Sequence, residues 1–126
     1  MAPKLIALVD DDLSVRRALP RLLRSGGYET RAFASPDELI ESGFAGEAAC
    51  LVLDVHLGRV SGFELLERLR AAGAKAPAIF ITAFDDAESR QRARRLGASG
   101  YLRKPFDGCE LLDAVAQAIA ATPATK

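Results

Sequence analysis

Short apolar runs alternate along the chain with longer stretches in which apolar residues recur every three or four positions. A run of about five apolar residues is typical of a strand buried on both faces, and the longer spacing is typical of an amphipathic helix. Strands that alternate with helices predict a parallel sheet with right-handed crossovers and helices on both faces. The expected strands are residues 5–9, 29–33, 50–55, 78–82 and 100–102.

The expected helices have well-marked boundaries. At four helix starts a capping residue is followed three positions later by glutamate, as in a capping box. These pairs are Ser35 and Glu38, Ser61 and Glu64, Asp85 and Glu88, and Asp107 and Glu110. Glycine is common just after a helix, and three helices are expected to end at Gly26 and Gly27, at Gly73, and at Gly97. Residues 43–49 have little pattern and predict a surface loop.

The length and composition are those of one globular domain. The 126 residues are 49% hydrophobic, which is enough for a core without disulfides or metals. Seventeen basic and seventeen acidic residues cancel, so no bulk charge attracts nucleic acid or an anionic membrane. The apolar runs are too short for a membrane span or a signal peptide.

Two cysteines, Cys50 and Cys109, lie in or beside apolar segments and match no metal-ligand spacing. We expect both to be buried thiols, which fits a reducing, cytoplasmic location. Residues 122–126 are rich in Ala, Thr and Pro and predict a flexible tail or the start of a linker. The domain is therefore expected to span residues 1–121.

Three consecutive carboxylates, Asp10, Asp11 and Asp12, directly follow the first expected strand. In an open parallel sheet, ligands bind at the carboxyl ends of the strands. Like charges this close raise one another's pKa unless a cation or a basic side chain lies among them. The triplet therefore predicts a divalent metal, a lysine, or both. The simpler interpretation is a helix cap, and it suits Asp12 best because the next helical pattern follows directly.

Three further polar residues stand at equivalent places in the pattern. Asp54 lies at the end of the third run, Thr82 ends the fourth, and Lys104 follows the fifth and precedes Pro105 and Phe106. Each has a simpler interpretation as well: a turn cap for Asp54, a strand-forming residue for Thr82 and a surface charge for Lys104. Together with the acidic triplet, they predict polar groups that converge on one edge of the sheet.

These motifs resemble those of the bacterial two-component response-regulator receiver domain, including receivers of chemotaxis regulators and of nitrogen-fixation-type transcriptional regulators. The matching segments are Val9-Asp10-Asp11, Leu53-Asp54 with Gly62 eight residues on, Ile81-Thr82-Ala83, and Lys104-Pro105-Phe106. The resemblance covers about residues 4–120. It implies a doubly wound α/β fold of the flavodoxin-like kind, with a five-stranded parallel sheet in the order 2-1-3-4-5 between two helical layers.

The resemblance also implies a phosphoacceptor site. Asp54 would be the nucleophile that takes a phosphoryl group from a sensor histidine kinase or a phosphotransfer protein, and Lys104 would neutralise charge during transfer. Asp10, Asp11, Asp54 and the backbone carbonyl of His56 would bind Mg²⁺, with Mn²⁺ as a substitute. Such a protein is a signalling phosphoacceptor with self-phosphorylation and autodephosphorylation activity rather than an enzyme acting on a separate substrate.

A switch is implied by the same resemblance. Thr82 would bind the attached phosphoryl group and Tyr101 would change rotamer, which would alter the face formed by the fourth helix, fifth strand and fifth helix. This face would bind a downstream protein, the protein's own output domain, or a second copy in a phosphorylation-dependent homodimer. The simpler interpretation of Tyr101 is an ordinary strand aromatic.

Three residues near the expected site depart from the family pattern or modify it. Gly58 stands four residues after Asp54, where proline is usual, and predicts a more mobile loop. His56 and Phe84 lie two residues beyond Asp54 and Thr82, beside the path of the hydrolytic water in this family. We expect both to tune dephosphorylation, and bulky Phe84 to slow it. The His56 imidazole is not expected to bind metal, because it has no partner ligands of its kind nearby.

A basic cluster on the fourth expected helix predicts a protein-docking surface rather than a nucleic-acid site, because no aromatic residues for base stacking accompany it. The cluster comprises Arg90, Arg92, Arg94 and Arg95. We therefore expect neither direct nucleic-acid contact nor membrane contact by this domain.

The main alternative is a phosphatase of the haloacid dehalogenase kind, with Asp10 as nucleophile and Asp12, Thr82 and Lys104 as its other motif residues. Three features argue against it: the chain has no room for a cap domain, no acidic pair follows Lys104 on a further strand, and Asp54 would have no role. A dinucleotide-binding domain fits less well, because no glycine-rich turn follows the first run. Whether the domain stands alone or belongs to a longer regulator is left open by the sequence.

Overall fold

The computed structural model describes residues 3–121. In chain order its elements are β1 (Lys4–Val9), α1 (Leu13–Ser25), β2 (Tyr28–Phe33), α2 (Pro36–Ser42), the 3₁₀ turn η1 (Phe44–Gly46), β3 (Cys50–Asp54), β4 (His56–Leu57), β5 (Val60–Ser61), α3 (Gly62–Ala71), β6 (Ala78–Thr82), α4 (Ala87–Arg95), β7 (Gly100–Arg103) and α5 (Gly108–Ala121). The five expected strands are confirmed, with ends that shift by one residue at most. The predicted tail, residues 122–126, lies outside the described residues.

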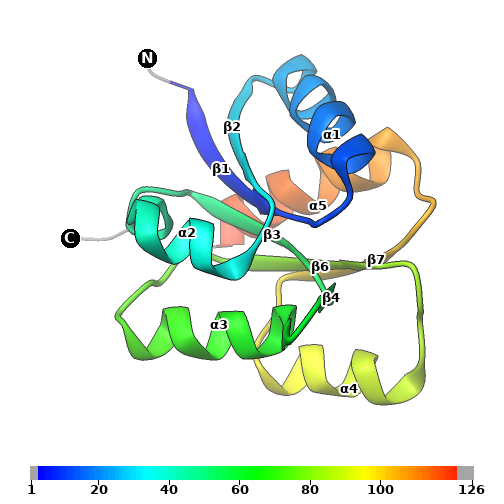
Figure 1. Ribbon diagram of the computed structural model, residues 1–126. Coiled ribbons are helices and arrows are strands. Elements are labelled where there is room, and N and C mark those ends of the chain that lie inside the picture. The colour runs from blue at the N-terminus through cyan, green and yellow to red at the C-terminus, as the bar shows by residue number, and fades with distance from the viewer. Residues whose placement is uncertain (1–2, 122–126) are drawn as a thin grey trace.

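A five-stranded parallel sheet forms the centre of the molecule, in the order β2-β1-β3-β6-β7 (Figure 1). Because β6 and β7 are the fourth and fifth strands of this sheet, the expected order 2-1-3-4-5 is confirmed. The register pairs Val9 with Leu53, and Asp54 with Ile81. The carboxyl ends of β1, β3 and β6 therefore reach the same edge of the sheet.

Helices cover both faces of the sheet, α1 and α5 on one side and α2, α3 and α4 on the other (Figure 1). The first side is packed around Leu23 of α1 and Leu111 of α5. The second is packed around Leu39 of α2, Leu66 of α3 and Ala93 of α4. Strands β3 and β6 are buried at every residue, as expected for strands covered on both faces.

The helix caps agree with the sequence at three of five starts. The Asp12 carboxylate caps α1 by accepting a hydrogen bond from the Ser14 N–H at 2.8 Å. Ser35 caps α2, and Ser61 with Glu64 forms the full capping box of α3. Each cap satisfies backbone N–H groups that have no partner within the helix.

The starts of α4 and α5 differ from expectation. Asp86 caps α4 through the Ser89 N–H, whereas Asp85 pairs with Arg90. Asp85 has the glutamate of a capping box three positions later and Asp86 does not, so the sequence pattern favoured the wrong one of two adjacent aspartates. At α5 only the reverse half is present, in which the Asp107 N–H donates to the Glu110 carboxylate.

Residues 43–49 are only in part the surface loop that their pattern predicts: Gly43, Gly46 and Glu47 are exposed. They contain η1, where Phe44 and Ala45 are buried and the Phe44 ring lies 6.1 Å from that of Phe33. Cys109 also differs from expectation, because it is exposed, whereas Cys50 is buried as predicted. The buried turn η1 was not expected because a 3₁₀ turn of three residues is too short to leave a periodic signal in the sequence.

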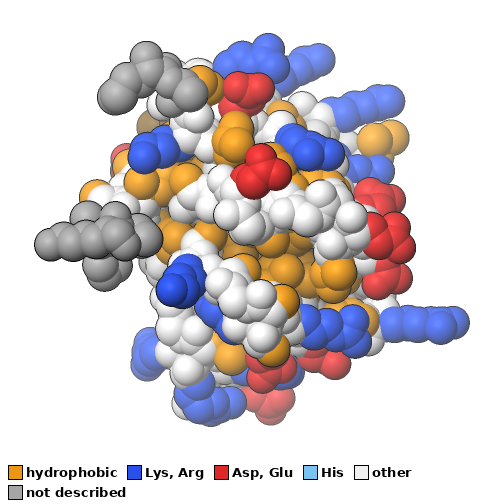
Figure 2. Space-filling view, turned by 90° about the vertical axis from the view of Figure 1, so that its left-hand side faces the viewer, with side chains coloured by type: hydrophobic (Ala, Val, Ile, Leu, Met, Phe, Trp, Pro, Cys, Tyr) orange, Lys and Arg blue, Asp and Glu red, His pale blue; other side chains and the backbone are white. Residues whose placement is uncertain are grey.

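A hollow of about 530 Å³ lies between the C-terminal ends of α2 and α3. Figure 2 looks onto this side of the molecule and shows hydrophobic side chains in its central depression. Leu39, Ile40 and Leu69 are among its lining residues, together with glycines and alanines that leave the space open. Within residues 3–121, the helices are too short or too polar to cross a membrane.

Candidate functional site

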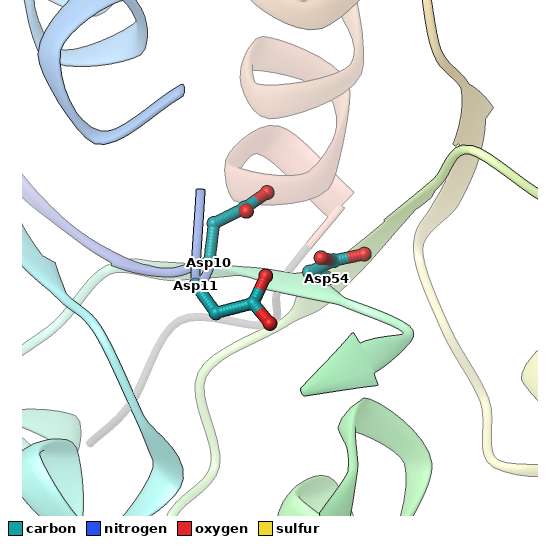
Figure 3. Close-up of side chains that lie close together, drawn as sticks. All are labelled: Asp10, Asp11 and Asp54. Atoms are coloured by element: carbon teal, nitrogen blue, oxygen red, sulfur yellow. The ribbon is translucent and has the colours of Figure 1, made fainter. Parts of the chain in front are cut away.

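Three carboxylates meet at the carboxyl edge of the sheet. Asp10 and Asp11 directly follow β1, and Asp54 is the last residue of the adjacent strand β3. Figure 3 shows the three side chains side by side, and one carboxylate oxygen from each lies within 4.8 Å of the others. Asp10 and Asp54 are buried, whereas Asp11 is exposed. The Asp12 N–H donates to Asp10 Oδ1 at 2.9 Å, which fixes the orientation of that carboxylate.

Lys104 reaches this cluster from the end of β7. Its Nζ lies 2.8 Å from Asp10 Oδ2 and 3.6 Å from Asp54 Oδ2. Its backbone N–H donates to the Thr82 carbonyl at 2.7 Å, which holds the chain after β7 against the end of β6. Burial acts to lower the pKa of Lys104, but the hydrogen bond to Asp10 and the charges of Asp54 and Asp10 outweigh it and raise that pKa. Lys104 is therefore a charged ammonium at neutral pH.

The Asp54 carboxyl has a pKa of about 6, well above its ordinary value of 3.8. Burial is the largest cause, the negative charge of Asp10 adds to it, and Lys104 offsets part of the rise. One ammonium thus does not compensate the acidic cluster fully. A divalent cation would fit here, because it would add positive charge among three carboxylates that supply the hard oxygen ligands such ions prefer.

Thr82 ends β6 and is fully buried. Its Oγ1 accepts a hydrogen bond from the Phe84 N–H at 3.0 Å and donates to the Phe84 carbonyl at 3.2 Å. Both bonds stay within the loop that follows β6. The Thr82 hydroxyl therefore forms its hydrogen bonds with the backbone of Phe84 and not with the carboxylates.

His56 and Phe84 stand together at the mouth of the site. Their rings meet edge to face, with centroids 5.4 Å apart at an angle of 81°. Phe84 is 69% exposed, although it is a large apolar residue. A cleft of about 290 Å³ connects these two rings with the acidic cluster and Lys104. Both aromatic residues therefore lie where they can restrict access of water to Asp54.

Gly62 is the first residue of α3 and packs against the backbone of Asp54. A Cβ atom at this residue would overlap the backbone carbonyl oxygen of Asp54 and press on Val55. The Gly62 N–H also donates to the Val55 carbonyl at 2.8 Å. Only glycine lets α3 approach the end of β3 this closely, which explains the glycine eight residues after Asp54.

Comparison with known proteins identifies the family. The model of the response regulator receiver domain matches residues 6–116. This chain belongs to that family. As a receiver domain, it is a part of the two-component signalling machinery, in which response regulators act with kinases.

The relatives of this receiver domain include transcriptional regulators. Nodulation protein W of Bradyrhizobium diazoefficiens is 42% identical over 114 residues, which are 90% of this chain and 50% of that protein. The transcriptional regulatory protein FixJ of Azorhizobium caulinodans is 36% identical over 110 residues, 87% of this chain and 52% of that protein. The receiver domain thus spans about half the length of each of these relatives.

Solved structures support the fold. The structure described as FixJ-N superposes with a TM-score of 0.85 at 28% identity and covers 99% of this chain and 100% of that one. The response regulator StyR gives a TM-score of 0.85 at 40% identity, covering 94% of this chain and 60% of that one. The alternative of a haloacid dehalogenase-like phosphatase is not supported, since family and fold both indicate a receiver.

The structure places Asp10, Asp11, Asp54, His56, Phe84 and Lys104 around one cleft. Thr82 lies at the end of the adjacent strand β6, whereas Tyr101 lies apart from the cleft, beside Asp85.

Two further residues were not expected from the sequence. Arg16 of α1 donates from Nη1 to the Asp10 backbone carbonyl at 3.0 Å and so supports the acidic loop. Asp85 pairs with Arg90 beside Tyr101. The carboxylates, Thr82 and Lys104 were recognised because each follows or ends a strand. Arg16 lies within α1 and Asp85 lies in the loop before α4, so that pattern could not identify them.

Proposed function

We propose that this receiver domain accepts a phosphoryl group on Asp54 from the phosphohistidine of a sensor histidine kinase or a phosphotransfer protein. The observation that supports this most is the Asp54 carboxylate itself. It is 5% exposed, opens onto the cleft, and has Lys104 Nζ 3.6 Å from its Oδ2. Burial of an ionised carboxylate destabilises the folded protein, so a functional role is the simplest reason for an acid at this position.

The transfer needs little from the protein beyond position and charge. An Asp54 carboxylate oxygen attacks the phosphorus, a P–O bond forms, and the P–N bond to the donor imidazole breaks. The leaving imidazole nitrogen takes a proton from solvent. The Lys104 ammonium neutralises charge on the phosphoryl oxygens, and Asp54 must be deprotonated to attack.

Asp10, Asp11 and Asp54, with the backbone carbonyl of His56, would hold Mg²⁺ or, in its place, Mn²⁺. When bound, the ion neutralises charge on the acids and on the transferring phosphoryl group. Self-phosphorylation by small phosphodonors and autodephosphorylation are part of the same proposal, because all the groups involved belong to this chain.

Phosphorylation would then act through Thr82 and Tyr101. The Thr82 hydroxyl would exchange its bond to the Phe84 carbonyl for one to the phosphoryl group, drawing the loop after β6 inward. Tyr101 would follow, and the face of α4, β7 and α5 would change. That face would bind an output domain, a downstream protein or a second phosphorylated copy. A cytoplasmic location belongs to this proposal, and the free thiols of Cys50 and Cys109 fit it.

Acetyl phosphate with Mg²⁺ tests the central step. We expect one base-labile phosphate per chain, seen by intact-protein mass spectrometry. When a chelator removes Mg²⁺ before the donor is added, no phosphate should be incorporated. Asp54→Asn should abolish it, because an amide oxygen is a poor nucleophile. Persistent labelling of that variant would overturn the assignment, and phosphate on Asp10 would favour a phosphatase-like mechanism.

Phe84 provides a second test. Replacing it by glutamate removes the edge-to-face contact with His56 and the apolar cover over the cleft. We expect the phosphoryl group on Phe84→Glu to hydrolyse several-fold faster than on the parent, measured as loss of label after donor removal. Phe84→Leu keeps an apolar side chain and serves as the control. Dephosphorylation of the glutamate variant at the parent rate would contradict this role.

A further inference from the structure

The loop of residues 83–86 joins Thr82 to α4 and is tied down at both ends. At its start Thr82 Oγ1 makes both hydrogen bonds to Phe84. At its end Asp85 Oδ2 pairs with Arg90 Nη1 at 2.7 Å, and the Asp85 side chain is only 19% exposed. Any inward movement of this loop has to break or carry along the contacts of Asp85.

The second oxygen of Asp85 has an unusual position. Asp85 Oδ1 is buried, and so is the hydroxyl of Tyr101 on β7, yet within residues 3–121 neither atom has a hydrogen-bond partner at ordinary geometry. The two groups are neighbours: burial, followed by the charge and the acceptor oxygen of Asp85, raises the pKa of Tyr101. Leaving a buried donor and a buried acceptor unpaired is unfavourable, and a small rotation of either side chain would let them pair.

The other polar neighbours of Tyr101 are less suitable acceptors. Asp86 also raises the pKa of Tyr101 by its charge, but its Oδ1 is engaged by the Ser89 N–H at 2.7 Å. The Ser89 hydroxyl is the remaining neighbour, and it acts on the pKa of Tyr101 in the opposite direction. Asp85 alone combines a full negative charge with a buried oxygen that is not otherwise used.

We propose that Asp85 is a positioning residue that holds the Tyr101 hydroxyl through Oδ1 while Arg90 fixes its Oδ2, so that the loop before α4 is latched to β7. The latch uses residues from three consecutive elements, the loop, α4 and β7. It opposes the loop movement that phosphorylation of Asp54 would cause, and this regulatory part rests on the proposed function. The latch itself does not.

Because the latch would hold the loop in the arrangement in which Thr82 Oγ1 bonds to Phe84, breaking it would shift the population toward the released loop. A ligand that binds the released arrangement must then bind more tightly, by the factor by which that population grows. Beryllofluoride, which mimics a phosphoryl group on an aspartate, serves as that ligand.

The first experiment observes the latch without any phosphoryl group. The chain has two tyrosines and no tryptophan, so 3-fluorotyrosine gives two ¹⁹F resonances, which Tyr101→Phe assigns. We expect Asp85→Ala to shift the Tyr101 resonance and to lower the pKa of its phenol. Glu88→Gln, which removes an exposed charge from the first turn of α4, should leave both nearly unchanged. Ser89→Ala should raise the phenol pKa, the opposite direction, with a smaller shift of the Tyr101 resonance. An unchanged Tyr101 signal in Asp85→Ala overturns the latch, as does a larger shift in Ser89→Ala.

The second experiment measures coupling. With Mg²⁺ present, we expect Asp85→Ala to tighten beryllofluoride binding two- to tenfold, and Arg90→Gln to tighten it less. In a Tyr101→Phe background Asp85→Ala should have almost no further effect, because the two residues act as one unit. Additive effects, or equal effects of Glu88→Gln, overturn the regulatory role. If the parent binds no beryllofluoride, the proposed function and the regulatory role fail together, and the fluorine spectra still decide the latch.

Discussion

At Asp54 the protein keeps a carboxylate in surroundings that disfavour its charge. The side chain is buried, a second carboxylate lies beside it, and its ammonium partner Lys104 is closer to Asp10 than to Asp54. These surroundings suit a nucleophile, because the desolvated carboxylate faces an open cleft and is held only by long contacts, the His56 N–H at 3.4 Å and Lys104 Nζ at 3.6 Å. They also mean that the folded protein carries an electrostatic cost at this residue.

That cost predicts a dependence of stability on pH. The pKa of Asp54 is about 6 in the folded protein against an ordinary 3.8, so between these values the folded state binds more protons than the unfolded state and stability falls as pH rises. Asparagine does not ionise. Without divalent metal, we expect Asp54→Asn to be more stable than the parent at pH 7, by up to about 3 kcal/mol.

Urea unfolding at a series of pH values measures the difference. The advantage of Asp54→Asn should shrink as the pH falls through 6 and be small near pH 4, where the carboxyl is protonated in the folded state and about half protonated in the unfolded state. Asp113→Asn, which removes an exposed charge on α5 away from the site, is the control for net charge. A stability difference that stays constant from pH 4 to 7 would show that burial of Asp54 does not carry this cost.

Among the described α-helices, α4 is held least firmly by apolar packing. Its one buried residue is Ala93, whereas α5 buries Leu111, Val115 and Ala118. What replaces apolar contact is Arg92, whose guanidinium lies 5.1 Å from the centre of the Phe63 ring and 3.6 Å from the Glu67 carboxylate of α3. A helix attached mainly through polar contacts can shift without exposing much of the core.

Arg92→Ala therefore should loosen α4 while leaving the domain folded. The cation–π contact and the exposed ion pair are each worth up to about 1 kcal/mol, so we expect amide hydrogen exchange in α4 to accelerate by about two- to tenfold. Arg95→Ala, an exposed arginine one turn later, is the matched control. Equal acceleration in both variants, or a comparable acceleration in α5, would contradict a specific role of Arg92.

At the level of elements, the sequence predicted what periodicity and strand ends can encode. Strands β1, β3 and β6 were found because each is an apolar run, whereas β2 is largely polar and β7 is short, and both were placed by their position between helical patterns. Asp10, Asp54 and Thr82 were placed at one edge because parallel strands end together. The short hairpin of β4 and β5 was missed, since two residues per strand carry no period.

On the scale of the whole molecule, the sheet separates two cores and brings its polar groups to one edge (Figure 1). Contacts that depend on the third dimension were beyond prediction: Arg16 supporting Asp10, and Asp85 beside Tyr101. Both join residues whose separation in the chain follows no secondary-structure period. The topology could be inferred from local patterns, whereas the side-chain pairs between elements needed the folded structure.

Because one cysteine is buried and the other is exposed, the native protein can be labelled selectively at a single thiol. Burial raises the pKa of the Cys50 thiol to about 12 and shields it inside β3, whereas Cys109 is exposed near the start of α5. A maleimide dye should therefore attach once to the native chain, at Cys109, and twice after denaturation. Mass spectrometry after brief labelling checks this, and two dyes on the native protein would contradict it. A fluorophore at Cys109 would report on the α5 side of the proposed output face without any substitution.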